Sequence, residues 1–282
     1  MVRNGVLPEE NYAKCRNGYR IHYLDRGDGP VVVFLHGSGP GASGYSNFKG
    51  NFEAIAEQGY RCIVPDLIGF GFSDKPNDVE HPLSFFVECV KQTLDLAGVK
   101  ECIVVGNSLG GAVAIGLALE YPEFVKKLVL LAPGGMSKTE EYFTMPGMQK
   151  MFEIYGSGET ITPEMMKEFF QFGLVHDPKH ATDQTIQERF QIMQIMNGHV
   201  MITMQIPYLV DRLPELQCPV LAFWGANDRM MPDMGLVGLA KNCAHLKLIV
   251  VSECGHWAMV EHEALFNREC LQFFAHTGAV WP

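Results

Sequence analysis

The chain has 282 residues, of which 47% are hydrophobic and 19% charged, and its formal net charge is −10. This is the composition of a globular protein with a sizeable core, and the length allows one large domain or two smaller ones. The acidic balance argues against a nucleic acid or an anionic membrane as partner because both require a basic face, and no apolar run is long enough to span a membrane.

The first twelve residues contain no apolar segment of the kind found in signal peptides, so we expect none and expect a cytoplasmic location. Eight cysteines are scattered along the chain without a C-x-x-C pair, at positions 15, 62, 89, 102, 218, 243, 254 and 270. Several lie in apolar runs. We therefore expect buried free thiols, with disulfides as the alternative.

Short runs rich in valine, isoleucine and leucine alternate with longer helical patterns. Most of these runs are continuously apolar, as expected for strands covered on both faces. The predicted strands are 19–25, 31–36, 61–65, 101–105, 127–131, 219–224 and 246–251, and the predicted helices between them are 47–58, 82–97, 108–121, 233–241 and 263–276. Repeated strand–helix units predict an α/β fold with a doubly wound, mostly parallel sheet.

The alternation breaks between residues 136 and 210, a stretch without a convincing strand. Helical patterns dominate there, at 138–155, 163–172, 183–197 and 200–209. We interpret 136–210 as a helical lid inserted into a core formed by 1–135 and 211–282. The segment holds ten of the fifteen methionines, which suit either gap filling in a small helical core or an adaptable apolar wall over a binding cleft.

The segment GNSLGG at 106–111 lies directly between a strand-like run and a helical pattern. Glycines on both sides allow a sharp turn with Ser108 at its apex. The turn holds the serine hydroxyl at a helix N-terminus, where amide groups and the helix dipole favour negative charge. Ser108 is therefore a candidate nucleophile.

A serine nucleophile needs a base that is itself oriented by an acid. Two later predicted strands lead into suitable residues, first Asp228 and then His256. Doubly wound hydrolases have the order serine, acid, histidine, and catalytic groups gather at the carboxyl ends of parallel strands. We therefore predict the triad Ser108, Asp228 and His256, although each residue alone also fits an ordinary role in a turn, a helix cap or a loop.

The glycine-rich loop HGSGPGASG at 36–44 follows a predicted strand, so its backbone N–H groups can face a ligand. Acyl transfer requires two such donors for the developing oxyanion. We expect them to be the amides of Ser38 and of Leu109, the residue after the nucleophile.

The same loop fits the dinucleotide fingerprint through Gly39, Gly41 and Gly44, and Asp66 follows about twenty residues later. A nicotinamide or flavin oxidoreductase is therefore an alternative, but it leaves the triad unexplained. Asp66 also fits a structural turn that is common after this strand in hydrolases. No zinc-protease pattern H-E-x-x-H is present among the histidines, and we expect neither a metal nor another cofactor.

Taken together, these motifs resemble the meta-cleavage product hydrolases of the α/β-hydrolase superfamily. The resemblance is carried by HGSGPGASG with the following YSNF, by GNSLGG, by WGANDRMMP and by CGHWAMVEH. It implies serine-dependent cleavage of a carbon–carbon bond in 2-hydroxy-6-oxo-hexa-2,4-dienoates, the ring-fission products of catechols. The products are 2-hydroxypenta-2,4-dienoate and a carboxylic acid. The resemblance also implies a homodimer or a larger homo-oligomer.

The resemblance further implies that Arg189, in the lid, binds the substrate carboxylate. A guanidinium suits this task because it offers a bidentate fork and stays charged, and a solvated surface charge is the alternative. Leu174 stands where some relatives carry a bulky aromatic, so the preferred 6-substituent is left open. The full expected substrate-binding set is Gly37, Gly39, Asn47, Asn107, Leu174, Arg189 and Trp257, with Ser38 beside it.

Two further functions stay open at this point. A carboxylesterase would use the same triad and oxyanion hole, and one protein can have both activities. A non-catalytic α/β-hydrolase receptor, which binds a ligand and signals through its lid, is an alternative of another class. In each enzymatic case the expected partner is a small anionic dienoate or an ester.

Overall fold

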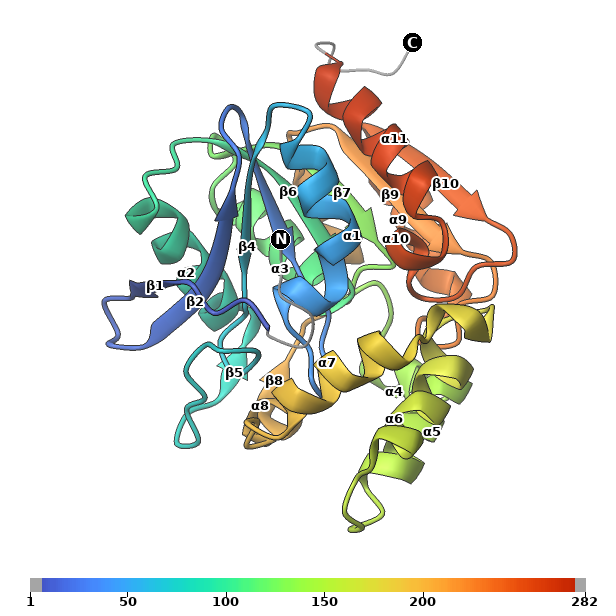
Figure 1. The fold of residues 1–282 in the computed structure, drawn as a ribbon. Coiled ribbons are helices and arrows are strands. Elements are labelled where there is room, and N and C mark those ends of the chain that lie inside the picture. The colour runs from blue at the N-terminus through green and yellow to red at the C-terminus, as the bar shows by residue number, and fades with distance from the viewer. Residues whose placement is uncertain (1–6, 277–282) are drawn as a thin grey trace.

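The structure is a computed structural model that describes residues 7–276, and Figure 1 shows a central sheet flanked by helices. The sheet has eight strands in the order β1-β2-β4-β3-β6-β7-β9-β10. The strands are β1 Asn11–Lys14, β2 Arg20–Arg26, β3 Val31–Leu35, β4 Arg61–Pro65, β6 Cys102–Asn107, β7 Val125–Leu131, β9 Val220–Gly225 and β10 Leu246–Val251. Only β2 runs antiparallel to its neighbours β1 and β4. The remaining pairings are parallel, which confirms the predicted fold class.

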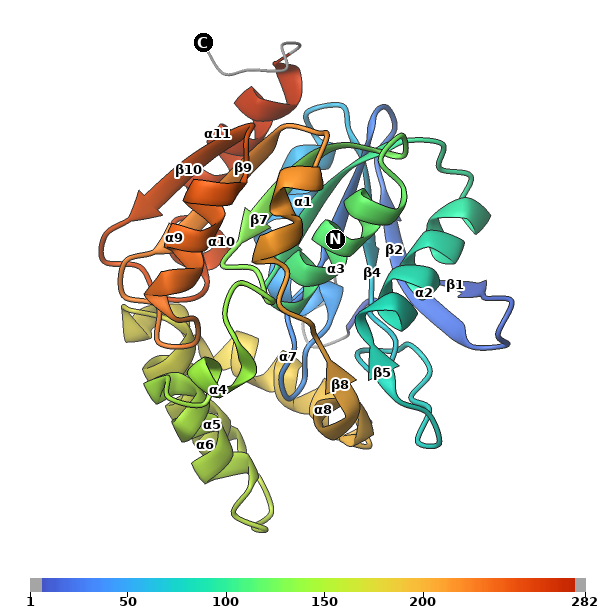
Figure 2. The same ribbon diagram turned by 180° about the vertical axis from the view of Figure 1, so that it is seen from behind.

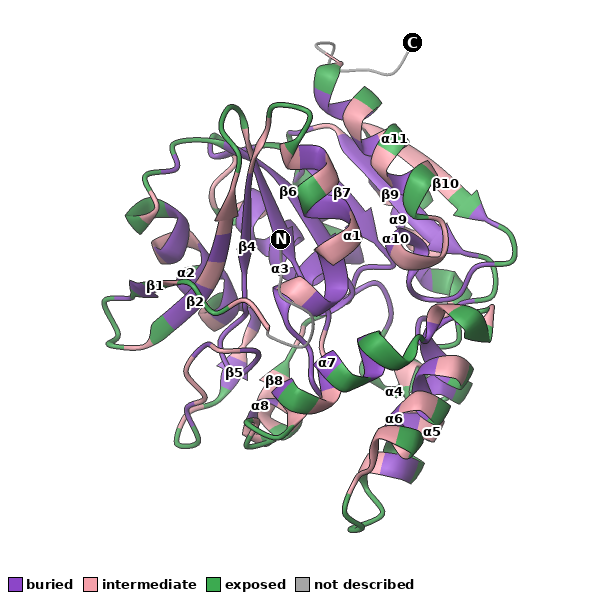
Figure 3. Ribbon diagram, in the orientation of Figure 1, coloured by how far each residue is buried: buried purple, intermediate pink, exposed green. Residues whose placement is uncertain are grey.

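Helices cover both faces of this sheet (Figures 1 and 2). One face carries α1 Gly44–Ala56, α10 Ala258–Glu261 and α11 Glu263–Ala275, and the other carries α2 Leu83–Leu96, α3 Leu109–Glu120 and α9 Asp233–Asn242. The two faces of the sheet and their helices form two apolar clusters. Figure 3 shows the central strands buried along their length, which explains their continuous apolar sequences.

Helix α1 begins three residues before its predicted start. Ser43 caps it, and a reciprocal capping box joins Ser43 to Ser46. This cap ends the glycine-rich loop at a fixed point, because two of the otherwise unpaired groups at the helix start are satisfied. The loop between β3 and α1 is therefore anchored at both ends.

The segment between β7 and β9 is mainly helical, as predicted, and lies below the carboxyl ends of the parallel strands in Figure 1. We call it the insertion. It contains α4 Thr139–Tyr142, α5 Pro146–Tyr155, α6 Pro163–Phe169, a π-helical turn Phe170–Leu174, a 3-10 turn Pro178–His180, α7 Asp183–Met193 and α8 His199–Thr203, and a second 3-10 turn, Val210–Glu215, follows it. The division into core and lid domains stays a prediction.

Three predictions about the secondary structure were wrong. The expected helix 138–155 is broken before Pro146, which starts a new helix at a position where proline is tolerated. The helix expected to reach residue 209 ends at Thr203 because Met204–Gln205 forms the short strand β8, which pairs with β5 His81–Pro82. A strand thus lies in a region expected to have none. Strand β1 was also missed, since only one of its four residues is buried.

All eight cysteines are free and buried, as expected. None of the helices in residues 7–276 has the length and apolar character needed to cross a bilayer. The signal-peptide prediction concerns a segment whose first six residues lie outside the described part of the chain.

Candidate active site

Ser108 occupies the turn between β6 and α3. Its backbone has φ of 54° and ψ of −117°, a conformation that costs a non-glycine residue about 1–3 kcal/mol. Hydrogen bonds on both sides hold it: its N–H donates to the carbonyl of Leu131 at 3.0 Å, and its own carbonyl accepts from Gly134 at 2.8 Å. The strained turn predicted from the sequence is therefore present and fixed by its neighbours.

The glycines around Ser108 are required by close backbone approaches. A Cβ at Gly106 would lie 2.3 Å from the carbonyl oxygen of Gly110, and one at Gly110 would lie 2.0 Å from that of Leu35. Strand β3 thus passes directly against the start of α3. This contact brings the glycine-rich loop, which follows β3, next to the nucleophile.

Asp228 and His256 form a buried pair. The two residues follow the adjacent strands β9 and β10, and Nδ1 of His256 lies 2.8 Å from Oδ2 of Asp228. The other carboxylate oxygen accepts from the amides of Met230 at 2.7 Å and Met231 at 3.0 Å. These bonds fix the carboxylate. Because the carboxylate engages Nδ1 of the imidazole, Nε2 is left to act as a base.

Ser108, Asp228 and His256 all follow the carboxyl ends of parallel strands in one sheet, as predicted. Ser108 is 9% exposed and His256 is 4% exposed, so both are shielded from bulk water. Within residues 7–276 no hydrogen bond engages the Ser108 hydroxyl. The hydrogen bond between Ser108 and His256 that catalysis requires stays a prediction.

The loop with the expected oxyanion donor lies against the nucleophile. A Cβ at Gly37 would lie 3.2 Å from Cβ of Ser108 and 3.0 Å from the side-chain oxygen of Asn107. Leu109 is the first residue of α3, and the first N–H groups of a helix have no partner within it. Both observations suit an oxyanion hole formed by the amides of Ser38 and Leu109.

His36, which the sequence analysis did not assign, fixes this loop from below. Its Nε2 accepts from the amide of Leu67 at 2.9 Å, so the ring proton lies on Nδ1 and is donated to the carbonyl of Gly37 at 2.7 Å. Burial lowers the pKa of His36 to about 4. The ring is therefore neutral at physiological pH, and its two hydrogen bonds connect the loop at Gly37 to the backbone at Leu67. Its position at the end of a strand, before glycine, is the signal that marks it in the sequence.

Arg189 is connected to the nucleophile through two asparagines. It is 3% exposed, and its guanidinium donates to the side-chain oxygen of Asn47 at 2.8 Å. The amide of Asn47 then donates to the side-chain oxygen of Asn107 at 3.0 Å, directly before Ser108. The chain of contacts joins α7, α1 and β6. Burial rules out the alternative of a solvated surface charge for Arg189.

The guanidinium of Arg189 lacks a carboxylate partner in the described residues. Its Nε is buried without a hydrogen bond, and its Cζ lies 4.9 Å from the ring centre of Trp257 and 5.4 Å from that of Phe170. The neighbouring Glu188 instead pairs with Lys49 at 2.5 Å. Burial lowers the pKa of Arg189 to about 9. A cation held this way is stabilised by any anion that binds beside it.

Tyr155 supplies a second buried donor that sequence reasoning missed. Its hydroxyl has no hydrogen-bond partner among residues 7–276. Its ring packs edge-on against Phe169 at 5.7 Å, which packs against Phe170, the ring below Arg189. Burial raises the pKa of Tyr155, while the guanidinium of Arg189 lowers it less strongly. The phenol is therefore a neutral donor within electrostatic reach of Arg189.

Leu174 and Trp257 meet through the backbone. The amide of Trp257 donates to the carbonyl of Leu174 at 3.2 Å, and both side chains are buried. Gly39 has a φ of +123°, and nothing lies within 4 Å of its would-be Cβ. Their contacts with a substrate stay predictions.

The dinucleotide fingerprint serves internal packing. A Cβ at Gly41 would lie 2.0 Å from the carbonyl oxygen of Arg189, and the amide of Gly44 donates to Asp66 at 2.7 Å. The other oxygen of Asp66 accepts from Phe72 at 2.8 Å and contacts Nδ1 of His22 at 2.8 Å. Burial raises the pKa of Asp66, but the bond from His22 and its other partners more than offset this and lower it. Asp66 is thus occupied within a structural turn, which argues against the oxidoreductase alternative.

The match to a known family is broad. The model of the family described as "alpha/beta hydrolase fold" matches residues 30–263. The chain belongs to the α/β-hydrolase family. Within that family it belongs with the meta-cleavage product hydrolases. It is 36% identical over 273 residues to a 2-hydroxy-6-oxo-6-phenylhexa-2,4-dienoate hydrolase from Burkholderia cepacia, covering 93% of this chain and 94% of that protein.

Other relatives of this α/β hydrolase support its assignment to the meta-cleavage product hydrolases. A 2-hydroxy-6-oxononadienedioate/2-hydroxy-6-oxononatrienedioate hydrolase from Comamonas testosteroni is 36% identical, over 93% of this chain and 94% of that protein. The solved structure of a meta-cleavage product hydrolase from Pseudomonas fluorescens IP01 superposes with a TM-score of 0.82 at 26% identity, covering 94% of this chain and 97% of the other. Within residues 7–276, no three histidine, cysteine or acidic side chains are grouped to hold a metal ion.

Proposed function

We propose that this α/β hydrolase cleaves the carbon–carbon bond of 2-hydroxy-6-oxo-hexa-2,4-dienoate ring-fission products. The observation that carries the proposal is Arg189, a buried cation joined to the nucleophile turn through Asn47 and Asn107. A buried guanidinium without a carboxylate partner favours an anionic substrate. The names of the relatives support the same class of substrate.

In this proposal the C1 carboxylate of the substrate accepts hydrogen bonds from Arg189 and from the hydroxyl of Tyr155. Both groups have donors buried without partners, so the ligand would satisfy them. Trp257 and Phe170 flank the guanidinium and would shield the ion pair from water. This anchoring would place the C6 ketone over Ser108.

The proposed reaction begins with a proton shift. The dienol loses the proton of its C2 hydroxyl, gains one at C5 and so becomes a 2,6-diketone, because only then can C5 depart as a stabilised enolate. His256 and the groups around Ser38 are suited to move this proton within a buried polar site. We infer the order of these proton transfers from the chemistry of the substrate.

Ser108 then adds to C6 as His256 removes its proton. The amides of Ser38 and Leu109 would stabilise the oxyanion. The C5–C6 bond breaks, its electron pair becomes part of the enolate of 2-hydroxypenta-2,4-dienoate, and His256 gives the serine proton to this enolate and becomes neutral again. Water activated by His256 releases the carboxylic acid from the acyl-serine, which restores the free enzyme.

A carboxylesterase activity remains the second candidate, since the triad and oxyanion hole would serve any acyl transfer. The decisive experiment mixes the enzyme with ring-fission products that carry methyl, isopropyl or phenyl groups at C6 and follows the yellow dienolate absorbance. Loss of the colour with formation of 2-hydroxypenta-2,4-dienoate supports the proposal. Hydrolysis of p-nitrophenyl acetate without any loss of dienolate would overturn it in favour of the esterase.

We further propose that the protein is a cytoplasmic homo-oligomer. Relatives of this kind are expected to be homodimers or larger assemblies, and the formal net charge of −10 argues against a nucleic-acid partner. Light scattering after size-exclusion chromatography tests the assembly, and a mass of one chain at micromolar concentration would contradict it.

A further inference from the structure

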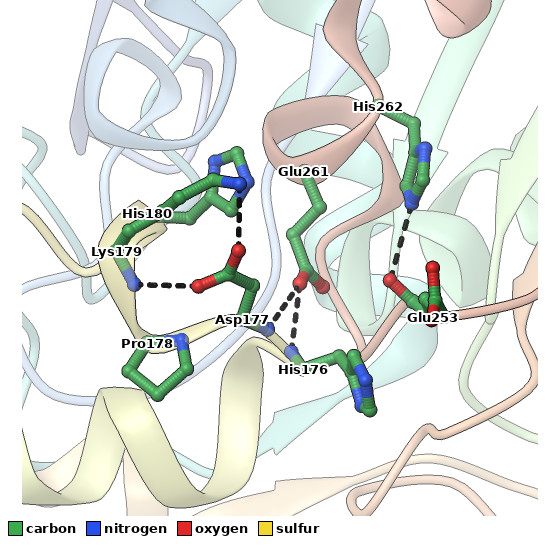
Figure 4. Close-up of a pocket in the computed structure, with 8 residues that line it drawn as sticks. All are labelled: His176, Asp177, Pro178, Lys179, His180, Glu253, Glu261 and His262. Carbon is green, nitrogen blue, oxygen red and sulfur yellow. Dashed lines mark hydrogen bonds and ion pairs between the residues drawn. The ribbon is translucent and has the colours of Figure 1, made fainter.

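The carboxylate of Glu261 joins two segments that are distant in the sequence. Oε1 accepts from the amide of Gly255 at 2.6 Å, and Oε2 accepts from the amides of His176 at 2.7 Å and Asp177 at 3.0 Å. Figure 4 shows the two bonds that reach the insertion. One side chain therefore satisfies three backbone donors, and hydrogen bonds to an ionised acceptor are stronger than neutral ones.

These segments are in direct contact around the proposed base. A Cβ at Gly255 would lie 2.8 Å from the carbonyl oxygen of Leu174 and 2.9 Å from the amide nitrogen of His176. The amide of Trp257 donates back to Leu174 at 3.2 Å. His256 thus lies between two residues whose backbones are both fastened to the insertion.

We propose that Glu261 is a positioning residue that sets the backbone orientation of His256 and holds the segment after the π-helical turn against it. The inference rests on the proposed catalytic role of His256. Asp228 orients the imidazole through Nδ1, and Glu261 orients the main chain from which the imidazole projects. Two carboxylates thus fix the base from opposite ends.

Replacing Glu261 by glutamine tests this with little change in volume. The amide keeps one acceptor oxygen, while its NH₂ group is a donor that faces a backbone N–H. The matched control is Glu253→Gln. Glu253 is exposed and, like Glu261, lines the surface pocket drawn in Figure 4, and in the described residues no hydrogen bond engages its side chain.

The measurement is the rate constant for labelling Ser108 with a fluorophosphonate. In this reaction Oγ bonds to phosphorus, fluoride leaves, and His256 takes the serine proton. A displaced imidazole lowers this rate constant at least about tenfold in Glu261→Gln, since small misplacements of a catalytic group are costly. Glu253→Gln labels at the wild-type rate. The rate constant reports the folded molecules and is independent of how much protein folds.

Equal rate constants for Glu261→Gln and the wild type would overturn the proposal, as would an equal decrease in both variants. If the glutamine variant yields no folded protein, Glu261→Asp takes its place. Aspartate keeps the charge on a shorter stem that cannot reach both segments, so slow labelling is again expected. A dienoate that is not cleaved refutes the proposed substrate but leaves this test intact, because the probe contains no dienoate. A wild-type protein that is not labelled refutes the proposed triad and the role of Glu261 together.

Discussion

The backbone of Gly41 lies against the main chain of Arg189, so closely that a Cβ at position 41 would be 2.0 Å from the Arg189 carbonyl oxygen. The sulfur of Met196 also accepts from the amide of Gly41 at 3.2 Å. The loop that carries the expected oxyanion donor is therefore in contact with the helix that carries Arg189, the residue expected to bind the substrate carboxylate. We therefore expect a displacement of the loop at Gly41 to shift the main chain of Arg189 as well.

Gly41→Ala should weaken substrate binding indirectly, through the main chain of Arg189. The residue has a φ of +71° and no room for a methyl group, so the substitution combines strain and a clash and costs about 1–3 kcal/mol of stability. The KM for the dienoate should rise more than that for p-nitrophenyl acetate. Gly98→Ala is the control, because its φ of +78° is similar but the space around it is open. Equal effects in both variants would show that strain alone is responsible.

Ser108→Ala should abolish turnover while leaving binding intact. Triad residues act as a unit, so the loss reaches up to about 10⁶-fold in kcat. Stopped-flow spectra of the dienoate with the variant should show a bound species that persists. Turnover above a few hundredths of the wild-type rate would disprove the nucleophile assignment.

Arg189→Gln should weaken binding of the dienoate selectively. A hydrogen bond to a charged group contributes about 1.5–3 kcal/mol, which corresponds to a rise of about 10- to 150-fold in KM. Hydrolysis of a neutral ester should be nearly unaffected. Arg268→Gln is the matched control, since 58% of that side chain is exposed. Parallel losses on the dienoate and the ester would contradict a role in carboxylate binding.

Tyr155→Phe should separate binding from stability. Removing the hydroxyl deletes a donor to the substrate, which should raise KM by about 2- to 10-fold. The free energy of unfolding should not fall, because the hydroxyl has no protein partner to lose in the described residues. Urea titrations and steady-state kinetics on the same preparation measure both. A drop in stability with unchanged KM would indicate that the hydroxyl is structural.

His36 should make the protein sensitive to mild acid. Its pKa is lowered from 6.5 to about 4 by burial, so the unfolded state binds more protons between these values and stability falls as the pH decreases from 6.5 to 4. The loss amounts to about 3 kcal/mol. Asp66 acts in the same direction but mainly at lower pH, because a carboxyl whose pKa is lowered from 3.8 loses most of its contribution as the pH falls below that value. Urea unfolding at several pH values measures the free energy of unfolding as a function of pH. Between pH 4 and 6.5 this free energy should change less with pH in His36→Asn than in the wild type.

Much of the fold could be predicted because its strongest signals are local. Strands β3, β6 and β9 are covered on both faces, so their sequences are continuously apolar and easily recognised. Strand β8 exists only because it pairs with β5, more than a hundred residues earlier in the sequence. No local pattern could reveal that pairing.

The candidate site also contains residues with local sequence signals and residues whose contacts depend on distant parts of the chain. Ser108, Asp228 and His256 follow strands and occur in a known order, so motif and topology together located them. The roles proposed for Glu261 and Tyr155 depend on contacts with other segments of the chain, and Glu261 bonds to a residue 84 positions away. In sequence both resemble ordinary helix residues. Their contacts were accessible only from the folded arrangement.

The attachments of the insertion bear on protein engineering. It is fastened to the rest of the molecule by the β5–β8 pairing, by the contact between Gly41 and Arg189, and by the carboxylate of Glu261. In each case one partner lies outside residues 136–210. A chimera that exchanges this segment with a homologue must therefore also transplant the residues outside it that make these contacts.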